Sequence, residues 1–553
     1  MDLFKTKLLI FVLFIVQCNA IPRFANYIQD HMVLQQAPQR AVVWGFGDTS
    51  KLTTLRMDDK IYTTISGAES VNEQDESIWS ITLDPVYDEG PFDIHVSQPL
   101  ANGTLVTITI HDILFGDVWI CSGQSNMQLT VSLIHNATEE IVNAGKYPKI
   151  RVFTADQEVS AMPLEELRGI RLNWSVASPN SIGGPNWNYM SAVCWLYGRM
   201  IHVALGERPI GLIASSVGGT PIELWMPPKA LQDCGIPPDD SVIVKSWNFS
   251  STETASNHST LFNAMIYPFM RTVIYGAIWY QGKTVDSFFC VSLSISILVS
   301  NEGEANRDYN THKYACSFSK MIQYWRESWN ERTNNITDIQ FPFGFVQLST
   351  FANNSEYIGS YPEIRWHQTF DIGYVPNNVV PKVFMAVTLD LRDDPNGDHP
   401  RYKHDVGYRL SRSGLAIAYN QQVEYQGPIV QTIVYFIGSQ TINITYTAVS
   451  NIDLRNPNGF EICCQGSKCA NDSLWIPITI SSRVELTITL SIPISCIGQQ
   501  LYGIRYLWRE TPCPFKQAAI YSFTDPNLPS PPYLKLFLTD RREVENNIFT
   551  YKR

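Results

Sequence analysis

This sequence lacks an excess of basic residues. Its 553 residues hold 41 Lys and Arg against 52 Asp and Glu, which gives a formal net charge of −11. No basic stripe along the chain offsets that balance, so we expect neither nucleic acid nor an anionic membrane surface as a partner. Net charge does not reveal local patches, and an anionic sugar would need only a local cluster of basic groups.

Beyond its first twenty residues the chain also lacks an apolar run that would span a bilayer. The N-terminal segment has the features of a secretory signal, because two lysines precede an apolar core from Leu8 to Val16 and small residues follow at 18–20. We therefore predict a signal peptide over 1–20. The mature protein is expected to have no membrane span and to enter the secretory pathway, where it is lysosomal or secreted.

Histidines at zinc-ligand spacing are missing beside the eleven cysteines, so we predict disulfides, no metal and no other cofactor. Five cysteines lie in the last hundred residues and indicate a C-terminal region stabilised by disulfides. Their pairing cannot be read from the sequence. Glycosylation sequons agree with an extracytosolic route. They begin at Asn102, Asn136, Asn173, Asn248, Asn257, Asn335, Asn353, Asn443 and Asn471.

The sequence contains no internal repeats or low-complexity linkers. Changes in the pattern of apolar residues divide the chain into regions instead. Residues 21–112 are strand-like and predict an N-terminal β domain. Residues 113–425 alternate buried strands with amphipathic helices, which predicts an α/β domain with a parallel sheet flanked by helices. Residues 426–553 again alternate at period two, as in 441–446 and 484–490, and predict a β-rich region that contains cysteines.

The residues most informative about chemistry lie at 116–127, GDVWICSGQSNM. An apolar strand ends at a glycine, and Ser125 follows between two amide side chains, Gln124 and Asn126. A nucleophilic serine needs such a strand-to-helix turn, with helix-start N–H groups near a developing oxyanion. The second glycine of the Gly-x-Ser-x-Gly elbow is missing here. The plainer interpretation is a helix cap.

Two further strands end in polar or glycine-rich turns. Gly218-Gly219 follows one of them, and paired glycines can aim backbone N–H groups at an anionic oxygen. Gln281 follows another, at the edge of the sheet where ligands bind in open α/β folds. A histidine should serve as the base. His399, in an Asp-rich loop after a predicted strand, is the first candidate and His367 is its rival.

Four segments together resemble the sialate O-acetylesterases, a family of SGNH-type carbohydrate esterases. They are GDVWICSGQSNM, GLIASSVGGTPIELW at 211–225, AIWYQG at 277–282 and HPRYK at 399–403. The resemblance extends over nearly the whole mature chain. It implies an SGNH-hydrolase-like fold and hydrolysis of acetyl esters on sialic acid, chiefly at position 9, without metal or organic cofactor.

The resemblance also implies roles for individual residues. Ser125 would be the nucleophile and His399 the base, and the N–H groups of Ser125 and Gly219 with the Asn306 side chain would form the oxyanion hole. We expect Gln124 and Gln281 to contact the substrate beside them. Such hydrolases often place an aspartate three residues before the histidine, where this chain has Asn396. Asp394 is therefore the predicted acidic partner, with Asp390 as the alternative.

One stretch departs from the family pattern. After AIWYQG the chain continues through 283–303 before Glu304-Ala305-Asn306 completes the motif. This insert is apolar, alternates at period two and contributes Cys290. One hypothesis is that it is translated intron, since its removal restores the motif in frame. The other is a lineage-specific loop at the rim of the site.

Two other functions stay open at the level of the sequence. One is an acetylesterase for other acetylated glycans. The presence of a basic group for the sialate carboxylate, with Arg151, Arg365 and Arg401 as candidates, would distinguish the two. The other is a catalytically impaired glycoprotein that binds sugars. The interrupted motif favours it, and the intact Ser125, His399 and Gly219 count against it.

Overall fold

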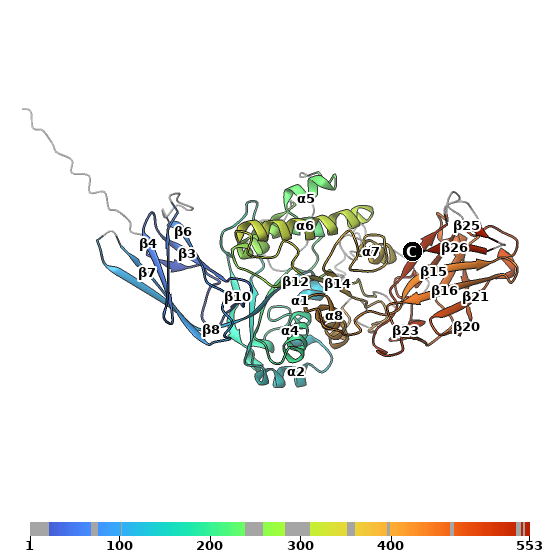
Figure 1. Cartoon of the computed structure of the whole chain (residues 1–553), viewed down its shortest axis with the longest axis horizontal. Helices are drawn as coiled ribbons and strands as arrows, with labels where there is room; N and C mark the ends of the chain where they lie inside the picture. The colour runs from blue at the N-terminus through green and yellow to red at the C-terminus, as the bar shows by residue number, and fades with distance from the viewer. Residues whose placement is uncertain are drawn as a thin grey trace, which may run out of the picture.

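The computed structural model describes residues 21–67, 76–100, 102–237, 258–281, 310–350, 360–394, 397, 399–464 and 469–537, together with the backbone of 543–545 and 548–552. Strands of the N-terminal region lie at one end of the long axis, a mixed α/β region lies in the middle, and further strands lie at the other end (Figure 1). Insert 283–303 and Asn306 lie outside the described residues.

The central region is built on a sheet with the strand order β10-β9-β11-β8-β12-β13-β14. All neighbours in this path are parallel except β10 and β9, so the sheet is mixed. Its mostly parallel pairing agrees with the parallel sheet that the alternation of strands and helices predicts. Its strands are β8 (Leu105–Gly123), β9 (Ile150–Ala155), β10 (Ile170–Val176), β11 (Ile210–Ser216), β12 (Gly276–Tyr280), β13 (Phe343–Val346) and β14 (Val383–Ala386).

Strand β8 joins the N-terminal strands to this sheet. Its first part pairs antiparallel with β7, and Leu114 to Gly116 pair with β2. Its last part, from Asp117 to Gly123, runs between β11 and β12. The boundary expected after residue 112 thus falls inside one continuous strand, at Asp112, whose φ is 56°.

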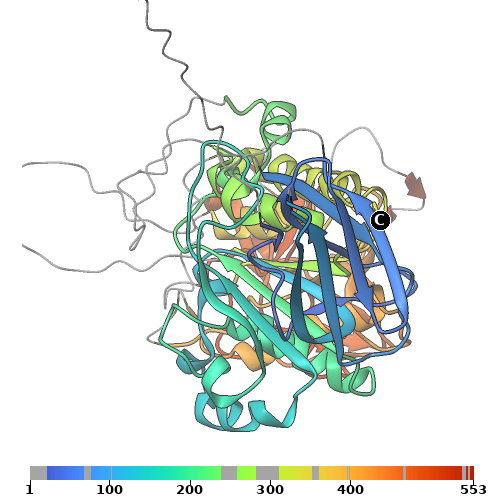
Figure 2. The ribbon, with the colours of Figure 1, turned by 90° about the vertical axis from the view of Figure 1, so that its left-hand side faces the viewer.

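Figure 2 views the molecule from the end that carries the N-terminal strands. They are β1 (Arg23–Phe24), β2 (Val33–Gln35), β3 (Val42–Asp48), β4 (Leu52–Met57), β5 (Lys60–Ile65), β6 (Glu76–Thr82) and β7 (Phe92–Pro99).

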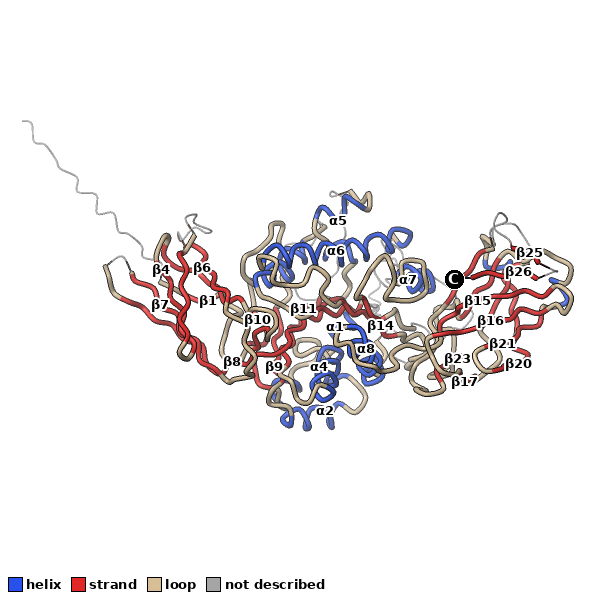
Figure 3. The backbone as a smooth tube through the Cα atoms, in the orientation of Figure 1, coloured by secondary structure: helices blue, strands red, loops and turns tan. Residues whose placement is uncertain are grey.

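Helices cover both faces of the central sheet. In Figure 3 α6 lies above the strands, whereas α4 and α8 lie below them. Helix α4 begins where the Ser191 hydroxyl accepts a hydrogen bond from the Cys194 N–H at 3.2 Å, and its buried face is apolar. The α-helices are α1 (Ser125–Gln128), α2 (Ala137–Asn143), α3 (Pro179–Ile182), α4 (Ala192–Ala204), α5 (Pro228–Asp233), α6 (Tyr314–Arg332), α7 (Tyr361–His367) and α8 (Lys403–Ile417).

The C-terminal region is β-rich, as its period-two pattern predicts. A six-stranded sheet has the order β20-β21-β16-β15-β26-β25, and a four-stranded sheet has the order β19-β18-β22-β24. Within the stretch 484–490, β20 ends at Val484 and β21 begins at Thr487, because Glu485 has a φ of 49° and turns the chain into a hairpin. The strands are β15 (Ile429–Phe436), β16 (Thr441–Thr447), β17 (Ile452–Leu454), β18 (Phe460–Cys463), β19 (Trp475–Ile478), β20 (Ile480–Val484), β21 (Thr487–Ser491), β22 (Gly503–Tyr506), β23 (Ile520–Ser522), β24 (Tyr533–Leu536), β25 (Glu543–Glu545) and β26 (Ile548–Lys552).

Disulfides form as the cysteine pattern predicts, and two of them brace the C-terminal region, where Cys513 remains a buried free thiol. Within the described ranges, no group of three or more His, Cys, Asp or Glu side chains has the arrangement of a metal site. In the same part of the chain, no helix combines the length and apolar character needed to cross a membrane. Among the described residues the bridges are Cys121–Cys194, Cys234–Cys316, Cys463–Cys469 and Cys464–Cys496.

Candidate active site

The predicted nucleophile lies at the carboxyl end of the central strand. Strand β8 ends at Gly123, and the short helix α1 begins at Ser125, whose exposed fraction is only 4%. Gly123 has a φ of 140°, and a Cβ there would lie 2.1 Å from the Tyr280 carbonyl oxygen. No other residue fits at this position without displacing β12. The sequence thus forms the sharp strand-to-helix turn that a nucleophilic serine requires.

The glycine pair after β11 lies directly against this turn. A Cβ on Gly218 would approach the Ser125 Cβ to 3.2 Å, and the Gly218 N–H donates to Gln128 Oε1 at 2.8 Å. Gly219 follows with a φ of 73°, the left-handed conformation that favours glycine. The Gln124 side chain donates to the Thr220 carbonyl. The loop that carries Gly219 and the turn that carries Ser125 are therefore held together.

Gln281 occupies the neighbouring position on the same edge of the sheet. It follows β12, is 1% exposed, and accepts a hydrogen bond from the Tyr314 hydroxyl at 2.6 Å. The Gln124 N–H donates to the carbonyl of Tyr280 at 3.0 Å, so the ends of β8 and β12 are joined at this point. Gln124, Ser125, Gly219 and Gln281 consequently share one edge of the sheet.

His399 reaches this edge from the loop between β14 and α8. Its ring is buried and packs edge-on against Trp187 with centroids 5.1 Å apart. The Trp187 carbonyl accepts a hydrogen bond from Gln128 Nε2 at 2.9 Å, so α1 and the His399 ring share one neighbour. Trp187 has a φ of 64°, which is unusual for a bulky residue and is found most often at functional sites.

Three residues that contact this site, Gln128, Trp187 and Lys403, were not predicted to be functional. Gln128 joins the glycine loop to the Trp187 backbone, and Trp187 packs on the histidine. Lys403 donates to the Asn126 side chain, next to the predicted nucleophile, at 2.6 Å. Only Lys403 carried a signal in the sequence, since it belongs to the same short segment as His399.

The acidic residues before His399 differ in what they contact. Asp390 is fully buried and takes two hydrogen bonds from Arg409 at 2.5 and 2.9 Å. Asp394, the predicted acidic partner, is ion-paired with Arg392 at 2.7 Å, and its side chain is 48% exposed. The rival base His367 lies at the end of α7, 2.6 Å from Asp371.

Asp393, between these two acids, anchors the loop. Burial by itself would raise the pKa of the Asp393 carboxyl, but hydrogen bonds from the Arg401 side chain and backbone outweigh that effect and hold the pKa below its ordinary value. The side-chain bonds are 2.9 and 3.0 Å long. The carboxylate thus fixes the segment on both sides of His399.

The three candidate arginines have different environments. Arg151 is buried and paired with Asp112 far from the end of β8. Arg365 is buried among backbone carbonyls, to which it donates four hydrogen bonds, and this burial lowers its pKa to about 10. Arg401, two residues after His399, is the candidate that belongs to the loop at the site.

Arg171 is a further basic residue, which was not among the candidates. It lines a hollow of about 260 Å³ together with Gln128 and Trp187.

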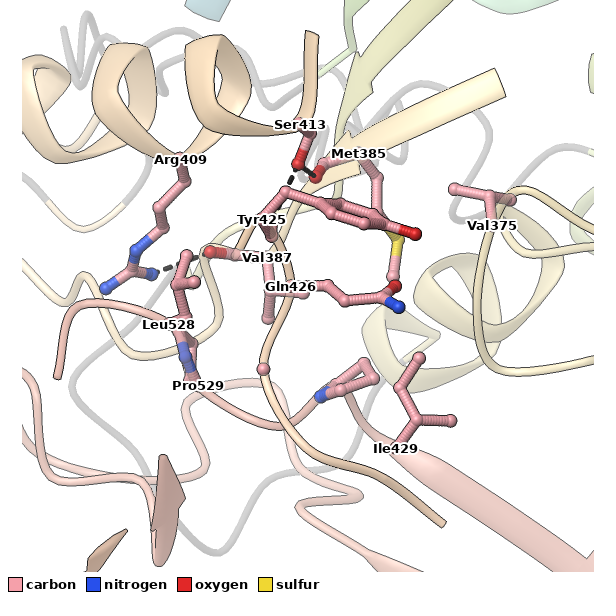
Figure 4. Close-up of a pocket in the computed structure, with 12 residues that line it drawn as sticks. Val375, Met385, Val387, Arg409, Ser413, Tyr425, Gln426, Ile429, Leu528 and Pro529 are labelled. Atoms are coloured by element: carbon pink, nitrogen blue, oxygen red, sulfur yellow. Dashed lines mark hydrogen bonds between the residues drawn. The ribbon is translucent and has the colours of Figure 1, made fainter. Parts of the chain in front are cut away.

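A larger hollow of about 380 Å³ lies between the central and C-terminal regions (Figure 4). Its wall is mostly apolar, and Arg409 in that wall donates to the Val387 carbonyl at 2.6 Å. Ser413 similarly donates to the carbonyls of Met385 and Tyr425. Because these polar groups bond to the protein itself, the candidate site is the edge near Ser125 and not this hollow.

Two parts of the chain match families of known proteins. Residues 115–287 match the family of carbohydrate esterases described as sialic acid-specific acetylesterases. Residues 431–537 match the sialate O-acetylesterase C-terminal domain.

Curated relatives match over almost the full chain. The sialate O-acetylesterases of Homo sapiens and Pongo abelii are each 38% identical over 524 residues, which cover 94% of this chain and 93% of the relative. The Mus musculus protein of the same name is 38% identical over 541 residues, 93% of this chain and 94% of the relative. Among solved structures, a carbohydrate acetylesterase from Xanthomonas citri has a similar fold. Its TM-score is 0.72 at 23% identity, with 93% of this chain and 99% of that chain covered.

Proposed function

This chain belongs to the sialate O-acetylesterase family and is a carboxylic ester hydrolase, and we propose that it removes acetyl groups from O-acetylated sialic acids through an acetyl-enzyme on Ser125. The preferred position is the 9-hydroxyl, and the substrate is free sialic acid or a sialoglycan. One observation supports this most directly: Ser125 begins α1 at the carboxyl end of β8, against the Gly218-Gly219 loop.

In the first step the Ser125 hydroxyl oxygen attacks the acetyl carbonyl carbon while the His399 imidazole accepts the hydroxyl proton. The N–H groups of Ser125 and Gly219 and the Asn306 amide donate to the resulting oxyanion. The intermediate then expels the sugar hydroxyl, which takes the proton from His399. Gln124 and Gln281 line the same edge of the sheet and are proposed to orient the sugar.

In the second step His399 takes a proton from water, and the water oxygen attacks the acetyl-enzyme. Collapse of the second intermediate releases acetate and returns the proton to Ser125. Asp394 is the proposed acidic partner of His399. Because its carboxylate is half exposed and also paired with Arg392, we expect Asp394→Asn to lower kcat only about tenfold, against roughly 10⁴-fold for a buried triad aspartate.

The wider organisation follows the same proposal. The central region, 113–425, would be an SGNH-hydrolase-like esterase domain between the β-rich parts 21–112 and 426–553. A signal peptide over 1–20 would direct the protein into the secretory pathway, to lysosomes or the outside, which agrees with four disulfides.

Acetate release from 9-O-acetylated sialic acid tests the proposal. The protein would be assayed with and without residues 283–303, each alongside Ser125→Ala and His399→Ala. We expect both substitutions to lower kcat by more than about 1000-fold. Activity on acetylated xylan but not on the sialic acid would contradict the substrate assignment, and unchanged activity of Ser125→Ala would contradict the catalytic one.

A further inference from the structure

Lys403 occupies a position that is unfavourable for a lysine on two counts. It is fully buried, which is rare for a lysine. It is also the first residue of α8, where the positive end of the helix dipole disfavours a cation. A residue that opposes both local preferences is commonly retained for a functional reason.

The Lys403 amine contacts two residues near the proposed nucleophile, Ser125. Its Nζ donates to Asn126 Oδ1 at 2.6 Å, and Asn126 directly follows Ser125. The same Nζ lies 5.1 Å from the centroid of the Tyr280 ring, at the end of β12. The Tyr280 carbonyl accepts from the Gln124 N–H, on the other side of Ser125. The buried ammonium group therefore contacts Asn126, which follows Ser125, and Tyr280, whose carbonyl holds Gln124. Gln124 is the residue before Ser125.

Lys403 is also joined to the base by a short piece of chain. His399 and Lys403 are four residues apart, and the Arg401 carbonyl between them accepts from the Lys403 N–H at 2.8 Å. Asp393 holds the Arg401 side chain, so this segment is fixed at its middle. The hydrogen bond between Lys403 and Asn126 therefore joins the segment 399–403, which carries His399, to the turn that carries Ser125.

We propose that Lys403 is a positioning residue for the reaction: its hydrogen bond to Asn126 sets the placement of Ser125 relative to His399. The inference rests on the proposed function, since it presumes those two residues as nucleophile and base. It adds a residue that acts on the serine through Asn126.

Lys403→Met, which keeps the length and removes the ammonium, is the first test. A misplacement of about 1 Å costs roughly 100-fold in rate, so we expect kcat to fall 10- to 100-fold with KM within about threefold of wild type. Asn126→Ala removes the other partner and should give a similar loss. The double variant should be no slower than the slower single variant, because both remove one contact.

Two measurements separate positioning from loss of structure. The rate at which a fluorophosphonate labels Ser125 reports the reactivity of the hydroxyl without sialic acid, and it should fall in parallel with kcat. Lys516→Met is the matched control, since it removes an ion pair of 2.6 Å between Lys516 and Asp405 of the same helix, and its kcat should equal that of wild type. If Lys403→Met does not fold, Asn126→Ala, which leaves α8 intact, carries the same expectation.

The inference is overturned if folded Lys403→Met or Asn126→Ala keeps kcat and labelling within twofold of wild type. It is also overturned if the losses of the two single variants multiply in the double variant, because the residues would then act independently. Failure of the proposed function would look different. In that case Ser125→Ala would retain activity, or the wild-type protein would release no acetate.

Discussion

The buried pair of Asp390 and Arg409 offers a sharp test of how the central and C-terminal regions are held together. Both side chains are at most 2% exposed, and their hydrogen bonds are 2.5 and 2.9 Å long. Asp390 also accepts from the Tyr521 hydroxyl of the C-terminal region at 2.7 Å. Burial by itself would lower the pKa of Arg409, and the Asp390 charge more than reverses this effect and raises it.

Asp390→Asn would leave the Arg409 cation in the core without its counter-charge. Breaking one partner of a buried pair costs about 3–5 kcal/mol, so we expect the free energy of unfolding to fall by that amount. The matched control is Asp394→Asn, four residues along the same loop, where the carboxylate is 48% exposed in its pair with Arg392. An exposed pair contributes about 0–1 kcal/mol, and the control should change little.

Urea unfolding followed by far-UV circular dichroism and tryptophan fluorescence would measure both variants. Since the chain has several regions, the two signals should be compared for separate transitions before a free energy is taken. A second variant, Asp390→Leu with Arg409→Met, removes both charges and should recover most of the loss. If Asp390→Asn costs no more than Asp394→Asn, the reasoning about the buried charge is refuted.

Three further predictions concern the surroundings of the site. Replacing Cys121 and Cys194 by alanine should lower the free energy of unfolding by about 4 kcal/mol, because their sequence separation is 73; an unchanged melting temperature would contradict this. Trp187→Ala should lower kcat for acetate release about tenfold while Trp187→Phe keeps most of it, since the ring packs on His399, the proposed base; wild-type rates in both variants would show that the ring is dispensable. The folded-state pKa of Asp393 lies below its ordinary value of 3.8, so its pair with Arg401 stabilises the fold above that pH and is lost as the pH falls through the folded pKa. Asp393→Asn should therefore melt below wild type at pH 7 and approach it as the pH falls through the folded-state pKa of Asp393; a difference that persists at low pH would contradict the sign.

Much of the fold and part of the site could be predicted from the sequence, because the relevant signals are local. The alternation of apolar strands and amphipathic helices indicates the central sheet, and glycines after strands mark its functional edge. Ser125, Gly219 and Gln281 lie at that edge because the carboxyl ends of parallel strands meet there. The hairpin at Glu485 was missed, since a left-handed residue other than glycine leaves no clear mark in the sequence.

The sequence by itself determined the family and the reaction, and it predicted the serine and the histidine, each from a short run of neighbouring residues. Only the tertiary structure decided which side chains surround them. Trp187 contacts His399, and Lys403 contacts Asn126, across separations of 212 and 277 positions in the chain. Arg365 is a candidate for the sialate carboxylate by its residue type, but its four hydrogen bonds to backbone carbonyls make it a structural group. Such contacts depend on how strands and helices from distant parts of the chain pack, and a residue's type and its sequence neighbours do not specify that packing.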